Sequence, residues 1–220
     1  MKHRKQKKIR AMPSTRRGAL VTGTALLLAA ASWVLSDSDA PEVMGELTEA
    51  PVRAVTAEKG WMPGATTKPI LLNFSVGERD AQRGLILHVQ EGKGSLYQQF
   101  SEPQQRSSSH FWVSLEGEIE QYVSVLDQAW TQVAGNSSWA SVETAGFAAQ
   151  PLTEAQVDAV ARIYAWGAAE HGWPDTIAES PEGSGLGTHL MGGHSWGGHA
   201  CPGAERSAQR KEILRRARNI

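Results

Sequence analysis

The sequence contains very little cysteine and almost no net charge. A single cysteine stands among the 220 residues, which excludes an internal disulfide framework. The formal net charge is −1 at pH 7, so no basic face is indicated and we expect no nucleic-acid partner. A chain of this length can form one domain with appendages.

Charge and hydropathy are segregated most clearly at the N-terminus. Residues 1–17 carry a dense run of basic side chains, and the apolar segment 18–35 follows without a charged residue. This layout is typical of a secretory signal or of an uncleaved membrane anchor. Arg16 and Arg17 stand where a twin-arginine export signal has its arginine pair. We therefore predict an extracytoplasmic protein, either secreted or tethered to the membrane through residues 18–35.

The residues that follow this segment do not decide whether it is cleaved. Ser38 and Ala40 have the small side chains that a cleavage site requires, but Pro41 normally blocks cleavage. The next residues are rich in Pro, Glu, Thr and Ala, without a clear apolar period. The predicted organisation is a signal peptide or membrane anchor at residues 1–40, a linker at 41–68 and one domain at 69–220.

Strand patterns dominate the first half of the predicted domain. Residues 84–92 form a short apolar strand that carries His88 near its end. Residues 109–123 predict a hairpin with a turn at Glu116 and Gly117. A third strand begins at Trp139 and closes on Glu143, a carboxylate that is either solvated or pointed into a cleft.

Helix patterns dominate the second half. Residues 151–174 carry a helical apolar period, with Thr153 and Gln156 as a capping box and Gly172 near the end. Residues 204–219 predict a terminal helix whose last turn is cationic, as the helix dipole favours. Strands that alternate with helices predict an α/β domain.

A glycine-rich segment, residues 187–203, combines Cys201 with several histidines. Thiolate and imidazole are ligands that zinc prefers, and a catalytic zinc site uses three protein ligands. Cys201 and one histidine of the segment are candidates for two of these ligands. His88, on its distant strand, is the candidate for the third ligand. The alternative is a glycine-rich loop with a buried free cysteine. The histidines of the segment are His189, His194 and His199.

Five segments follow one another along the chain: LHVQEG, SSSHFWVSLEGEIEQYVSVLDQAW, GNSSWASVE, LTEAQ and GGHACPG. Their order and spacing are those of type-2 N-acetylmuramoyl-L-alanine amidases. The chain from Pro69 to its end therefore resembles this family of zinc amidases, which shares its fold with peptidoglycan recognition proteins. The resemblance implies a central mixed β-sheet flanked by helices, a zinc cofactor and peptidoglycan as the substrate.

The resemblance also implies which residues hold the metal. His88 matches the first zinc ligand of the family, and Cys201, before Pro-Gly, matches the last. For the middle ligand we favour His189, with His194 as the alternative because its spacing to the cysteine is closer to that of phage enzymes.

Two further residues match catalytic positions of the family. Glu143 corresponds to the catalytic glutamate, and His199 stands where many relatives carry a residue that assists the oxyanion. The implied reaction is hydrolysis of the amide between N-acetylmuramic acid and the L-alanine of the stem peptide. The alternative is a recognition module on the same fold that binds peptidoglycan without cutting it. In either case we expect a monomer.

The chain departs from the family pattern at two positions. Ser109 stands where tyrosine is frequent, and Thr131 replaces a histidine of the substrate groove. The pattern leaves open whether His110 lies beside the site or packs in the core. We expect Trp196, within the glycine-rich segment, to border the cleft.

Overall fold

The computed structural model describes residues 58–77 and 79–220. All of them belong to one compact unit, Arg53–Ile220. The predicted signal or anchor segment lies outside the described residues. Among the helices that are described, none has the length and apolar character needed to cross a membrane.

The centre of the fold is a six-stranded sheet with the strand order β1-β5-β4-β7-β3-β8. β4 and β5 are antiparallel, and every other neighbouring pair is parallel. The expected mixed sheet is therefore confirmed. The strands are β1 Thr66–Thr67, β3 Gly84–Val89, β4 Phe111–Val113, β5 Ile119–Gln121, β7 Ala140–Thr144 and β8 Gly185–Thr188.

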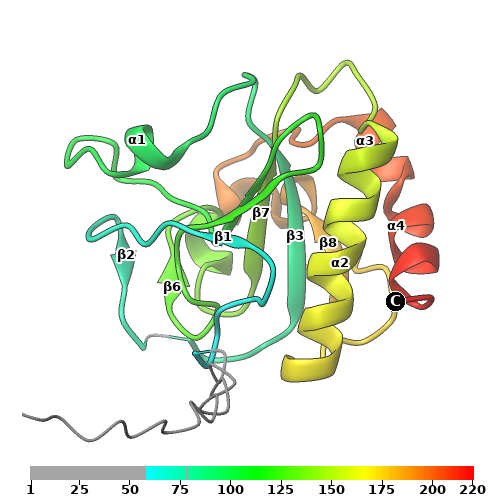
Figure 1. Cartoon of the computed structure of the whole chain (residues 1–220), viewed down its shortest axis with the longest axis horizontal. Coiled ribbons are helices and arrows are strands. Elements are labelled where there is room, and N and C mark those ends of the chain that lie inside the picture. The colour runs from blue at the N-terminus through cyan, green and yellow to red at the C-terminus, as the bar shows by residue number, and fades with distance from the viewer. Residues whose placement is uncertain (1–57, 78) are drawn as a thin grey trace, which may run out of the picture. The chain divides into compact units, whose positions relative to one another are not determined.

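Helices and a small second sheet surround this sheet. Figure 1 shows α2 (Glu154–His171) beside α4 (Arg210–Ala217) on one side of the sheet. A two-stranded sheet of β2 (Phe74–Ser75) and β6 (Gln128–Ala129) lies apart from the main sheet. The remaining helices are α1 Tyr97–Phe100, α3 Ala204–Ala208 and two 3₁₀ segments, η1 Val133–Gly135 and η2 His189–Trp196.

β3 is buried along its whole length, as expected for a strand between parallel neighbours. Leu85 and Leu87 face the main core, which α2 and α4 complete. Ile86 points to the opposite face, into a smaller core with Trp139 and Trp196. Because side chains alternate along a strand, His88 lies on the same face as Ile86, away from the main core.

Helix α2 begins and ends where the sequence predicts. The Thr153 hydroxyl accepts a hydrogen bond from the Gln156 backbone N–H at 3.1 Å, and Gln156 Oε1 accepts one from the Thr153 N–H at 3.1 Å. Gly172 adopts the left-handed conformation at the C-cap with φ of 71°. The capping box and the glycine stop are both confirmed.

Two boundaries differ from the predictions. The linker predicted up to residue 68 extends too far, because β1 pairs with β5 and Met62 packs into the core. A strand as short as β1 leaves no alternation in the sequence to detect. The predicted terminal helix is divided at Gln209, whose side chain donates to Leu152 O at 3.0 Å and accepts from Leu152 N at 2.7 Å.

Replacing Thr153 by alanine tests the capping box. Thr153→Ala removes the cap and the hydrogen bond that the Thr153 hydroxyl donates to Leu115 O at 2.8 Å. We expect the free energy of unfolding to fall by about 1–2 kcal/mol, measured by urea denaturation. Thr67→Ala, at an exposed position of β1, is the control. An equal loss of stability in both variants would contradict the role of the cap.

Candidate metal centre

The strand register places the predicted site residues side by side. His88 pairs with Glu143 between the parallel strands β3 and β7. On the other side of β3, Leu87 pairs with Thr188, so His189 follows beside His88 at the end of β8. These positions lie at the carboxyl ends of parallel strands, where open α/β sheets bind their ligands.

Cys201 completes a compact group of donors. One ligand atom from each of His88, His189 and Cys201 lies within 4.8 Å of the others. The Val89 N–H donates to Cys201 Sγ at 3.2 Å, and the Leu190 N–H donates to Cys201 O at 2.9 Å. The end of the glycine-rich segment is therefore bonded both to β3 and to its own beginning, which holds the thiol beside the imidazoles.

Hydrogen bonds orient both imidazole rings in the same way. His189 Nε2 lies 2.7 Å from the carbonyl oxygen of Trp196, which can only accept. His88 Nε2 lies 3.2 Å from the side-chain oxygen of Gln132. Each ring thus keeps Nδ1 free as a ligand atom. Metal-bound histidines commonly donate their other N–H to an oxygen in this manner.

Glycines in the 187–203 segment make room for a buried tryptophan. Trp196 is 2% exposed and packs edge to face on Trp139. A Cβ atom at Gly192 or Gly135 would lie only 2.0 or 2.5 Å from the Trp196 ring. The prediction that Trp196 borders the cleft is therefore wrong. Its ring fills the space between two backbone segments, and its carbonyl orients His189.

Burial favours the neutral forms of the site residues. It raises the pKa of the Cys201 thiol to about 12 and that of the Glu143 carboxyl to about 7. Burial also lowers the pKa of His88 and of His189. A thiolate in these surroundings needs a nearby cation. Two neutral imidazoles and a thiol form a donor set that suits zinc, so the residues present fit the ion that the resemblance implies.

The donors open into a cavity of about 360 Å³, which Glu143, His199, Thr131 and Ala148 also line. Glu143 Oε1 lies 3.9 Å from His88 Nδ1. Glu143 Oε2 is buried and has no hydrogen-bond partner among the described residues. Glu143 therefore brings to the cavity wall a carboxylate with one unpartnered oxygen, which is a candidate to bind a water.

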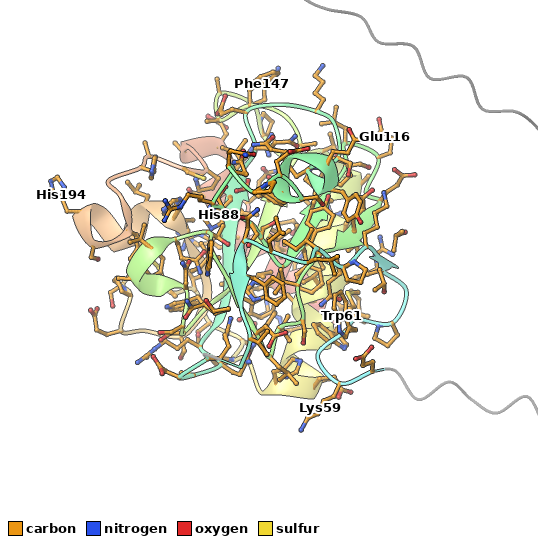
Figure 2. The ribbon with its side chains drawn as sticks, turned by 90° about the vertical axis from the view of Figure 1, so that its left-hand side faces the viewer. Lys59, Trp61, His88, Glu116, Phe147 and His194 are labelled. Carbon is orange, nitrogen blue, oxygen red and sulfur yellow. The ribbon has the colours of Figure 1, made fainter. Side chains whose placement is uncertain are left out.

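The two remaining histidines of the segment take different places. The ring of His199 lies 4.9 Å from the ring of His189, between centroids, and its side chain is exposed at the cavity. His194 is exposed, and Figure 2 shows it at the periphery of the molecule, pointing away from His88. Of the two candidates for the middle ligand, the structure brings His189 into the donor group.

His110 packs in the core and does not line the cavity. Its Nδ1 lies 3.0 Å from the Ser141 hydroxyl and its Nε2 lies 3.1 Å from Asp127 O. Burial lowers the pKa of His110 to about 3. Ser109, at the frequent tyrosine position, is also buried and donates to Phe111 O at 2.8 Å.

Two residues that support the site were missed from the sequence. Gln132 contacts His88, but an amide in a loop gives no sequence signal of such a role. Arg206, in the first turn of the predicted terminal helix, is 1% exposed and donates to the Thr144 hydroxyl at 2.6 Å and to Ala145 O at 3.1 Å. It ties α3 to the end of β7, next to Glu143.

Comparison with known proteins identifies the family of this domain. The profile of the N-acetylmuramoyl-L-alanine amidase family matches residues 78–204. This match covers more than half of the chain and contains all the donors described above. The chain belongs to this amidase family. No curated protein sequence gives a significant match.

Solved structures of amidases share the fold. AmpD, solved as a selenomethionine derivative, superposes with a TM-score of 0.54 at 17% identity over 71% of this chain and 97% of its own. The Staphylococcus aureus hydrolase AmiA, solved with its ligand, superposes with a TM-score of 0.56 at 14% sequence identity. The superposition covers 71% of this chain and 83% of the AmiA chain. A mutant endolysin from Bacillus subtilis superposes with a TM-score of 0.51 at 16% sequence identity. The superposition covers 71% of this chain and 99% of the endolysin chain. At these identities the likeness concerns the fold alone.

The raised pKa of Glu143 makes the stability of the metal-free protein depend on pH. The folded state favours the protonated carboxyl group, because ionising it in a buried position is unfavourable. The resulting loss in the free energy of unfolding is absent below about pH 4.5 and grows as the pH rises to about 7. Glu143→Gln mimics the protonated form. We expect it to raise the free energy of unfolding increasingly from pH 5 to pH 8, with an upper bound of about 3 kcal/mol.

Urea denaturation of both proteins in a chelating buffer, at several pH values, measures this difference. Titrating groups that do not interact with Glu143 are common to the two proteins and cancel in the comparison. Parallel stability curves across the pH range would contradict the burial of an ionisable Glu143.

Proposed function

We propose that the protein is a zinc-dependent N-acetylmuramoyl-L-alanine amidase that hydrolyses the amide between the lactyl group of N-acetylmuramic acid and the L-alanine of the stem peptide. The observation that carries the proposal is the convergence of His88, His189 and Cys201 beside the unpartnered carboxylate of Glu143 in one cavity. Family membership supports the reaction class, amide hydrolysis in peptidoglycan.

His88 and His189 would hold the zinc through Nδ1, and Cys201 would hold it through Sγ. When bound, zinc supplies a Lewis acid that polarises the amide carbonyl and activates water for attack. Three protein ligands leave a coordination position open, as a catalytic site requires.

Glu143 has the properties of a general acid and base. In the metal-free site burial raises the pKa of Glu143 to about 7, towards the range in which a carboxylate can accept a proton from the attacking water and release it to the leaving amine. The unpartnered Oε2 has no competing hydrogen bond among the described residues that would hold it away from the substrate.

His199 stands at the cavity rim, next to His189. From this position an imidazole N–H could donate a hydrogen bond to the oxygen of the tetrahedral intermediate. In other enzymes, removing such a donor raises the activation free energy by about 3–4 kcal/mol.

The substrate also bears on the location of the protein. Peptidoglycan lies outside the cytoplasm, and the basic and apolar segments at residues 1–35 have the layout of an export signal or anchor. We propose an extracytoplasmic enzyme, either secreted or tethered.

Removing the metal or the proton carrier tests the mechanism. A chelator is expected to abolish release of stem peptides from purified peptidoglycan, and added zinc is expected to restore it. Glu143→Gln is expected to lower kcat by about 10²- to 10⁴-fold while the zinc content stays unchanged. Undiminished cleavage in chelator would contradict the zinc mechanism. Binding without cleavage by the wild type would indicate a recognition module instead.

The identity of the middle ligand is tested by metal content. We expect His189→Ala to lose stoichiometric zinc after dialysis, because an imidazole of the donor group is removed. His194→Ala, an identical change at an exposed position of the same segment, is the matched control and is expected to keep its zinc. The reverse result would assign the middle ligand to His194.

A further inference from the structure

We propose that Gln132 is a positioning residue for the metal centre: its side-chain oxygen fixes His88 as the Nε2-protonated tautomer and thereby presents the Nδ1 lone pair to the cavity. This proposal rests on the zinc-dependent function proposed above. Gln132 lies in the loop before η1, outside the cavity lining, and acts only through His88.

Two backbone carbonyls fix the orientation of the Gln132 amide. The amide nitrogen lies 3.2 Å from Trp139 O and 3.4 Å from Gly135 O. Both oxygens can only accept, so the NH₂ group must face them and Oε1 must face His88. A reversed amide would set its own oxygen against two carbonyl oxygens.

The orientation of the amide decides the tautomer of His88. Oε1 of Gln132 lies 3.2 Å from His88 Nε2, and an amide oxygen can only accept. Nε2 must therefore carry the proton, which leaves Nδ1 as the basic nitrogen. Nδ1 faces the cavity, where it lies 3.9 Å from Glu143 Oε1.

Hydrogen bonds from its own backbone to Asn136 brace the loop that carries Gln132. Asn136 Oδ1 accepts hydrogen bonds from the backbone N–H groups of Thr131 and Gln132, at 2.9 and 2.7 Å. The next residue, Val133, has a φ of 48°, which is uncommon for a β-branched side chain. The turn leaves Val133 65% exposed and Gln132 fully buried. Backbone strain of this kind clusters at functional sites.

Zinc affinity measured by competition with a chromophoric chelator tests the proposal on the full-length chain. Gln132→Met has a similar volume but replaces the amide oxygen and NH₂ group by a thioether, which accepts hydrogen bonds only weakly and donates none. We expect it to weaken zinc binding about 10- to 100-fold, as loss of such outer partners does in other metal sites.

Gln121 offers a matched control. It is also fully buried, and its amide donates to Gly60 O and Val123 O while its oxygen accepts from the Met62 N–H. Gln121→Met thus removes the same number of hydrogen bonds from a site on β5 that does not contact the donors. We expect this variant to lose stability in urea but to keep its zinc affinity.

A spectroscopic readout tests the tautomer without any metal. Nitrogen-15 NMR of histidine side chains in the chelator-treated full chain is expected to show His88 protonated at Nε2 in the wild type and in Gln121→Met. Gln132→Met is expected to lose this preference. If this variant does not fold, Gln132→Asn, which keeps the amide but draws the oxygen back by one methylene, is expected to show the same loss.

The outcomes separate the two proposals. Wild-type zinc affinity in Gln132→Met, or an equal loss in Gln121→Met, would overturn the role of Gln132 and leave the zinc enzyme intact. A tautomer in the wild type with the proton on Nδ1 would also overturn it. A wild-type chain that bound no zinc would overturn both proposals.

Discussion

The site depends on one constraint, the parallel pairing of β3 with β7 and β8. Parallel strands in register bring their carboxyl ends to one edge, so His88 meets Glu143 on one side and His189 on the other. This pairing also buries His88 to 1% exposure. A buried imidazole needs partners for both nitrogens, and the structure provides an oxygen at Nε2 and an open cavity at Nδ1. The strand pairing that builds the core thus also prepares the site.

Elements with strong local patterns could be predicted from the sequence. Helix α2 has an apolar period, a capping box and a terminal glycine, and its limits follow from these alone. The resemblance supplied His88, His189 and Cys201, because ligand types at fixed spacings leave a recognisable pattern. Their convergence within 4.8 Å required the sheet register, which no local pattern encodes.

The features that could not be predicted depend on contacts distant in the chain. Glycines around Trp196 indicate an open loop when only the sequence is considered, but in the fold they allow a large ring to be buried. Gln132 contacts a residue 44 positions away, and its role depends on two backbone carbonyls. β1 is too short to show alternation. In each case contacts between distant parts of the chain determine the structure, and the local sequence favours no particular outcome.

A metal site at these donors also requires that the glycine-rich segment, residues 187–203, be rigid. A segment with so many glycines loses much conformational entropy when it becomes ordered, yet ligands must be held within fractions of an ångström. The ordering comes from contacts outside the segment: the Val89 N–H holds Cys201 Sγ, the Trp196 ring packs on Trp139, and Arg206 ties the following helix to β7. These contacts join the glycine-rich segment and α3 to β3, to Trp139 and to β7, all within one compact unit. The donor geometry is therefore a property of the folded domain as a whole, and a change that loosens the Trp196 or the Arg206 contact acts on the donors without touching them.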